Sequence, residues 1–228
     1  MIRRALVLLA ATALVTGSSA SADSPKDSLH AAVKATAGAK TARIAVKQRV
    51  TTAGRTSDST AAGVLAVGDQ DLVLSGEGGG SRRIAVGTKV KERRPDAAAQ
   101  PWHESARNAP TQTSALGPLT LSDGTSIGDP RLYASVTDAG TDALPQGPAR
   151  KLVGELDMAA VATAMQVTAA ERARMATWTG TLTLWVGADG KVAKNSVRIV
   201  IPSASGGTTI EAEIALSDLD APLTVGLP

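Results

Sequence analysis

The two histidines, His30 and His103, are the side chains whose types could carry acid–base or nucleophilic chemistry. Glu104 follows His103, and a serine–histidine–acid site would need both to meet a serine in three dimensions. The one G-x-S-x-G match, residues 124–128, lies in a Pro-rich stretch and follows no predicted strand, which the strand–turn–helix setting of a nucleophilic serine requires, and the histidines lack the spacing of a metal site. The chain has no cysteine, which excludes thiolate nucleophiles and zinc–thiolate sites. We therefore expect a protein that is not an enzyme and uses no cofactor.

Charge and aromatic content argue against a nucleic-acid-binding protein. The formal net charge is +3, but two of the basic residues, Arg3 and Arg4, lie in a segment that we expect to be removed. Without them 22 basic residues face 21 acidic ones, so the attraction to phosphate backbones is weak. Aromatic residues make up 2% of the chain and Phe is absent, which leaves few rings for base stacking.

The first 22 residues have the pattern of a secretion signal peptide. A basic start precedes an apolar run at residues 5–15, which is too short to span a bilayer, and an Ala-Ser-Ala site follows at residues 20–22. Cleavage there would leave one domain, residues 23–228, outside the cytoplasm. Residues 14–18 resemble a bacterial lipidation box, but Ser18 stands where the lipidated cysteine is required. We therefore expect a secreted or envelope protein without a lipid anchor.

The carboxyl-terminal segment, residues 179–228, predicts three antiparallel strands that alternate apolar and polar residues. A period of two puts each set on one side of a sheet. Asp189-Gly190 between the first two strands is a strong hairpin signal. Pairing across the next, Ser/Gly-rich turn would bring Arg198 near Glu211 on the polar face. A long apolar face must be covered by the protein's own helices or by an apolar ligand.

The preceding chain predicts a helix followed by a meander of strands. Ser24 can cap a helix over residues 23–38, which Gly38 would end. The period then changes to two, which predicts strands near residues 41–51, 61–67, 71–75, 82–86 and 89–93, with a turn at residues 53–58.

The central part of the chain mixes short elements with a long excursion. Residues 94–128 are rich in Pro, Ser, Thr and Gly, and we interpret them as a surface excursion with a strand around Trp102. The remaining elements expected are a helix from Asp129 to Gly140, a strand at residues 149–156, one or two helical turns at 157–165 and a helix opened by the Thr168–Glu171 capping box.

Runs of strands with few helices indicate an α+β domain with one antiparallel sheet. A large twisted sheet tends to curl. The sequence therefore predicts a curved antiparallel β-sheet, a half-barrel, wrapped around a few helices.

Several segments resemble the LprG/LppX-type actinobacterial envelope lipoproteins and, more remotely, the lipoprotein carrier LolA. They are Leu184-Trp185-Val186 followed by Ala188-Asp189-Gly190-Lys191, the closing residues 216–225, Gly128-Asp129-Pro130-Arg131-Leu132, and Pro101-Trp102. The resemblance implies a LolA/LprG-like half-barrel whose space between sheet and helices accommodates acyl chains. It also implies binding of lipid or acylated molecules, or their carriage across the envelope, without catalysis.

The apolar rows of the predicted sheet are the candidate lipid-binding residues. They could line a cavity or form a closed core beneath the helices. The residues are Ile44, Val46, Leu182, Leu184, Val186, Val197, Ile199, Ile201, Ile210 and Ile214.

A basic run offers a candidate membrane-surface contact through Lys89, Lys91, Arg93 and Arg94. These side chains could attract anionic headgroups at a cavity mouth, or they could protect an exposed edge strand. The three tryptophans favour structural roles, and Trp185 falls on the polar face of its strand. An alternative function is an interaction or sensor module with a collapsed cavity, which would bind a protein partner through residues 94–128.

Overall fold

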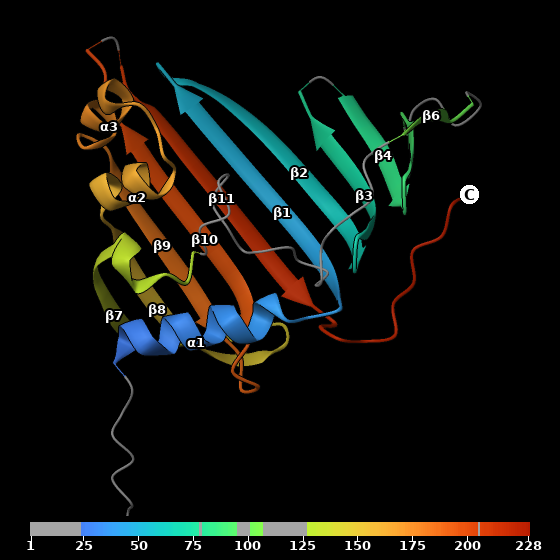
Figure 1. The fold of residues 1–228 in the computed structure, drawn as a ribbon, viewed down its shortest axis with the longest axis horizontal. Coiled ribbons are helices and arrows are strands. Elements are labelled where there is room, and N and C mark those ends of the chain that lie inside the picture. Colours follow the sequence, from blue (N-terminus) through green and yellow to red (C-terminus); the bar gives the residue numbers. More distant parts are fainter. Residues whose placement is uncertain (1–23, 78, 95–100, 107–126, 205) are drawn as a thin grey trace, which may run out of the picture.

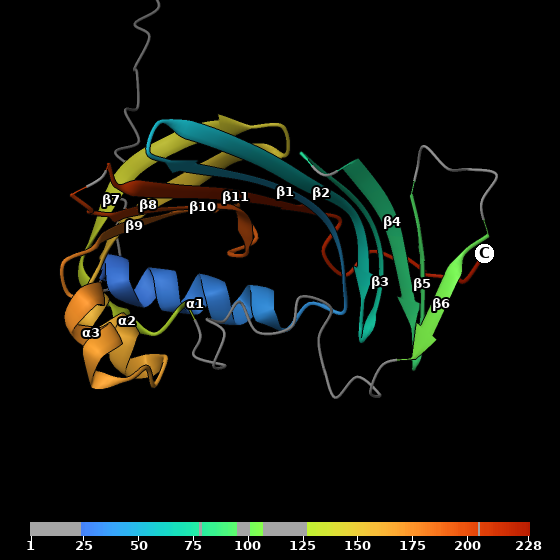
Figure 2. The same cartoon turned by 90° about the horizontal axis from the view of Figure 1, so that it is seen from above.

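In the part of the chain that the structure describes, one open antiparallel sheet of eleven strands curves around three α-helices, which confirms the α+β half-barrel predicted from the sequence (Figures 1 and 2). The computed structural model describes residues 24–77, 79–94, 101–106, 127–204 and 206–228. The strand order is β6-β5-β4-β3-β2-β1-β11-β10-β9-β8-β7. The first and last strands of the chain, β1 and β11, therefore meet in the middle of the sheet. The predicted signal peptide and most of the predicted 94–128 excursion lie outside the described residues.

Every strand pairs antiparallel with its neighbours in the sheet. The strands are β1 (Thr41–Thr52), β2 (Arg55–Ala66), β3 (Asp69–Gly76), β4 (Gly79–Val86), β5 (Lys89–Arg93), β6 (His103–Ala106), β7 (Tyr133–Leu144), β8 (Gly147–Leu156), β9 (Thr179–Val186), β10 (Val192–Ile201) and β11 (Thr208–Ser217). The three predicted carboxyl-terminal strands are confirmed, and Arg198 Nε lies 3.3 Å from Glu211 Oε1 as expected.

The helices begin where the sequence offers caps. In α1 (Pro25–Ala37) the Ser24 hydroxyl accepts a hydrogen bond from the backbone amide of Asp27. Asp157 caps α2 (Met158–Ala164), and a reciprocal Thr168–Glu171 capping box opens α3 (Ala169–Met175). These contacts satisfy amides that have no partner within the helix. Three of the four predicted helix starts are therefore confirmed.

The prediction of a helix from Asp129 to Gly140 is wrong. Only one turn of 3-10 helix, η2 (Pro130–Leu132), forms there, and its cap is the Asp129 carboxylate, which accepts from the amide of Arg131. Strand β7 follows at once because Tyr133 and the residues after it pair with β8. Gly140 takes a positive φ of 89° beside an irregularity in that pairing. It therefore marks a break in the strand register rather than a helix end.

Two further expectations about the strands need correction. The turn predicted at residues 53–58 is only Ala53 and Gly54, because Ser57 and Asp58 already pair with β1. The basic strand β5 is not an edge strand, since β6 pairs with it and forms the edge itself. The strand expected near Trp102 is confirmed as β6.

The hydrophobic core lies between the helices and the concave face of β7–β10 (Figure 2). Its largest side chains with almost no exposure are Leu29, Val33, Leu152, Leu184 and Val192. The strands β1–β6 extend the sheet beyond this core, and Figure 2 shows them curling round to form the other side of the half-barrel. This arrangement gives one concave face with two differently covered halves.

Candidate functional site

The concave face passes from a helix-covered half to a half over which no described helix lies. Helices α2 and α3 lie over β7–β9, and α1 runs along one end of the strands, packing on β7 and β10 (Figures 1 and 2). Beyond β10 the concave side of β11 and β1–β3 carries no described helix. The alternation of apolar and polar residues along a strand can be seen in the sequence. Which strands the helices cover depends on where the helices dock, so the sequence does not predict this division.

The ten candidate lipid-binding residues share the concave face but fall into two groups. Leu182 and Leu184 are buried in the core cluster, and Val186 and Val197 pack against it. The other six are half-buried outside that cluster, on the three central strands β1, β10 and β11: Ile44, Val46, Ile199, Ile201, Ile210 and Ile214. Register brings the second group together, because Ile199 pairs with Ile210 and Ile214 pairs with Val46.

A pocket of about 420 Å³ lies on the concave side of β1–β5. Its apolar lining residues are Val46, Ala61 and Leu74, and its polar ones include Gln48, Ser59, Ser81, Glu92 and Arg94. This volume falls in the range of small-molecule pockets. Sequence reasoning missed Ala61 and Leu74, although it placed both in strands. The signal that assigns them to this face is their pairing, Val46 with Ala61 and Ala61 with Leu74.

The basic run does not form one patch, because alternation along β5 divides it between the two faces. Lys89, Lys91 and Arg93 take the convex side, whereas Arg94 lines the concave pocket. The Lys91 ammonium donates to the backbone carbonyl of Pro228 at 3.3 Å. The Arg93 guanidinium lies 4.6 Å from the centre of the Trp102 ring. Arg94 is thus the basic residue of this run that lies beside the candidate cavity.

Trp185 lies on the convex face, as its strand parity predicted. Its indole Nε1 donates to Asp142 Oδ2 at 2.8 Å, and the Lys194 ammonium stands 4.7 Å from the ring centre. The indole hydrogen bond, together with one from Lys151, holds the pKa of Asp142 below its ordinary value. Trp185 therefore organises a polar cluster behind the sheet and does not contact the concave pocket.

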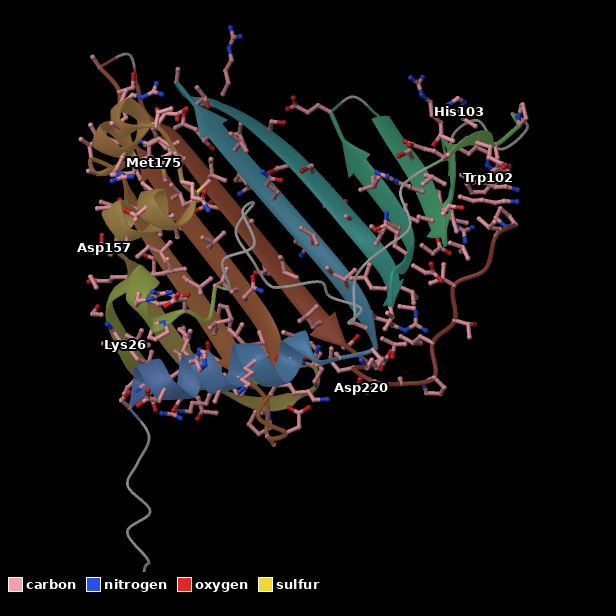
Figure 3. The ribbon with its side chains drawn as sticks, viewed as in Figure 1. Lys26, Trp102, His103, Asp157, Met175 and Asp220 are labelled. Atoms are coloured by element: carbon pink, nitrogen blue, oxygen red, sulfur yellow. The ribbon has the colours of Figure 1, made fainter. Side chains whose placement is uncertain are left out.

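The two histidines lie on separate elements. His30 on α1 pairs its ring Nδ1 with the backbone carbonyl of Gly128 at 2.9 Å. His103 is exposed on the edge strand β6, and Figure 3 shows it on the opposite side of the molecule from Lys26, which lies in the first turn of α1. Within the described ranges, no group of three His, Asp or Glu side chains could hold a metal ion. No described helix is long and apolar enough to cross a membrane.

Comparison with known proteins identifies the fold through solved structures. No family model and no curated protein matches the sequence. The crystal structure of the Mycobacterium tuberculosis lipoprotein LppX is similar at a TM-score of 0.54 and 14% identity, over 89% of this chain and 98% of that one. LprF from Mycobacterium bovis aligns over 90% of this chain and 96% of its own at 17% identity, with a TM-score of 0.47. The chain therefore has the LppX fold.

Proposed function

We propose that this protein binds the acyl chains of a lipid or acylated molecule on the uncovered half of its concave face. One observation carries the proposal: the apolar row of the sheet continues beyond the helix-covered core into a pocket of about 420 Å³. A soluble domain gains stability by covering such residues, so an apolar face that its described helices leave open suits an apolar ligand.

The energetics favour long hydrocarbon chains. Each methylene removed from water contributes about 0.8 kcal/mol, so an acyl chain can bind well without a fixed set of polar contacts. The half-buried group around Ile199, Ile210 and Ile214 supplies the apolar wall, and the pocket at Val46 continues it. Glu92 and Arg94 also line this pocket, at the end farthest from β10.

A location outside the cytoplasm fits this activity. The signal-peptide pattern of residues 1–22 and the shared fold with the lipoprotein LppX both support it. Since Ser18 replaces the lipidated cysteine, we propose a secreted form that carries its ligand through the envelope rather than a form anchored in a membrane.

Ligand loading provides the first test. The full chain with its own export segment is expressed in a bacterium with a lipid-rich envelope, and the processed protein is purified without detergent. Native mass spectrometry should show a discrete added mass that organic extraction releases as lipid. A protein of bare mass that also fails to bind a fluorescent fatty-acid probe would contradict the proposal.

A pair of substitutions tests the face itself. Ile199 lies on the concave side of β10 and the next residue, Val200, lies on the convex side. Ile199→Arg should reduce fatty-acid-probe binding at least tenfold, because the guanidinium would be desolvated by the bound chain. Val200→Arg should leave binding within twofold of the wild type. Circular dichroism verifies that both variants fold, and equal binding by both would exclude this face.

A further inference from the structure

A buried amide side chain interrupts the apolar concave row. Asn195 on β10 is 4% exposed. Its side-chain nitrogen, Nδ2, is buried and has no hydrogen-bond partner among the described residues. Its neighbours in register are Leu184 on β9 and Ile214 on β11, which cannot accept a hydrogen bond through their side chains. The amide donor thus lies between two aliphatic side chains and has no hydrogen-bond partner in the part of the chain that the structure describes.

The unsatisfied Asn195 amide lowers the stability of the fold, so its presence suggests a functional role. An unsatisfied buried amide destabilises a fold, because it loses its hydrogen bonds to water and gains none in the protein. The concave positions on either side of Asn195 along β10, Val192 and Val197, carry the aliphatic residues that a closed core prefers. A leucine or valine would fill the same place without this cost. The presence of Asn195 at this position therefore points to a hydrogen-bond acceptor that does not belong to the chain.

The position of Asn195 links it to the candidate cavity. Pairing runs across the concave face from Leu184 to Asn195, then to Ile214, to Val46 and to Ala61. Leu184 belongs to the closed core, whereas Val46 and Ala61 line the pocket. Two strand spacings separate Asn195 from Val46, which amounts to roughly 10 Å. Asn195 therefore marks the boundary at which the helix-covered core meets the uncovered face.

We infer that the Asn195 side-chain amide, which lies beside the cavity and not in its lining, is the polar anchor of the ligand: it donates a hydrogen bond to a carbonyl oxygen of the acyl chain that displaces the aliphatic side chains around it. The inference rests on the proposed function and specifies its ligand class. The chemistry favours a neutral ester or amide over a free fatty acid. A buried carboxylate needs a compensating charge, and the residues directly opposite Asn195 supply none. A plain hydrocarbon would leave the amide unsatisfied.

Competition binding with matched ligands tests this anchor. Methyl palmitate, palmitate and octadecane each displace a bound fluorescent fatty-acid probe from the delipidated full-length protein. The wild type should prefer the methyl ester over octadecane by about threefold to tenfold, the ratio that one neutral hydrogen bond supports. Asn195→Leu should remove this preference while keeping octadecane affinity. Its melting temperature without ligand should equal or exceed that of the wild type.

Controls separate the anchor from general packing. Val200→Leu alters the convex face of the same strand and should keep the ester preference. If Asn195→Leu does not fold, Asn195→Val provides the same comparison with less volume. An ester preference that survives in the apolar variant, or a wild type that binds ester and hydrocarbon equally, would overturn the anchor and leave the proposed function intact. A wild type that binds no ligand would overturn both.

Discussion

The hydroxyl of Thr36 on α1 accepts a 2.7 Å hydrogen bond from the backbone amide of Val192 on β10. The same hydroxyl donates to the carbonyl of Ala32, so both of its roles are satisfied while Thr36 is completely buried. The contact lies where the pairing of β9 with β10 shifts register between Val192 and Lys194. One side chain thus satisfies the amide at a strand irregularity and fixes α1 on the sheet.

This contact predicts a specific loss of stability. Thr36→Val keeps the shape of the side chain but leaves the Val192 amide without an acceptor, which should lower the free energy of unfolding by about 1–3 kcal/mol. Urea denaturation followed by circular dichroism measures the change. Thr36→Ser retains the hydroxyl and should lose clearly less stability. Equal losses in the two variants would show that the methyl group, not the hydrogen bond, holds α1 in place.

Gly63 should tolerate no side chain. A Cβ at this position would lie 1.9 Å from the backbone carbonyl oxygen of Asp71, because β2 and β3 approach closely on the concave side. Gly63→Ala must therefore push the two strands apart, and we expect it to cost at least about 2 kcal/mol of unfolding free energy. At Gly76 a Cβ would meet the Ser59 Cβ at an ordinary 3.5 Å. Gly76→Ala should melt within a few degrees of the wild type, and similar melting of both variants would refute the predicted clash.

The Asp142 carboxylate should contribute a pH-dependent stability. Bonds from Trp185 and Lys151 lower the pKa of Asp142 below its ordinary value of 3.8, so the folded state prefers the ionised form. Its stabilisation is therefore complete above the ordinary pKa and is lost as the pH falls through the lowered one. Asp142→Asn should melt below the wild type at neutral pH, and this difference should shrink progressively as the pH falls below 3.8.

A melting series from neutral to acidic pH measures this effect. Glu104→Gln is the control, because this carboxylate is exposed on the edge strand β6. A gap between wild type and Asp142→Asn that stays constant over the whole series would assign the loss to packing around Trp185 rather than to charge.

Asp220 should fix the carboxyl-terminal segment to the sheet (Figure 3). Its carboxylate accepts from the Lys40 amide at 2.8 Å and from the Lys191 ammonium at 2.6 Å, and its own amide donates to the Thr41 carbonyl. Asp220→Ala removes both carboxylate contacts at a residue with φ of 62°. We expect faster amide exchange over residues 221–228, measured by hydrogen exchange with mass spectrometry.

Asp220→Asn is the matched control for this segment. The amide oxygen can still accept from Lys40, and asparagine tolerates a positive φ, so only the charge pairing with Lys191 is lost. Exchange in this variant should lie between those of the wild type and Asp220→Ala. Unchanged exchange in the alanine variant would show that other contacts, such as that between Lys91 and Pro228, suffice to hold the segment.

Local chemistry determines much of this fold and can be followed in the sequence alone. The caps at Ser24 and Thr168 start helices because they satisfy nearby amides, and alternation alone assigns Ile199 and Ile210 to one face. The helix predicted from Asp129 does not form because a tertiary contact outweighs a local signal. Its capping signal is real, but pairing of the following residues with β8 overrides the helix that the cap could start.

Tertiary structure alone decided how the apolar face is used. Leu184 and Ile214 read alike in the sequence, yet helix docking buries one in the core and leaves the other half-buried beyond it. Register between distant strands brought Ala61 and Leu74 to the pocket and placed Asn195 between two aliphatic neighbours. A side chain's face follows from its own strand, because alternation is local. Its neighbours and its cover depend on segments far away in the chain, and these are determined only when the whole sheet pairs and the helices pack on it.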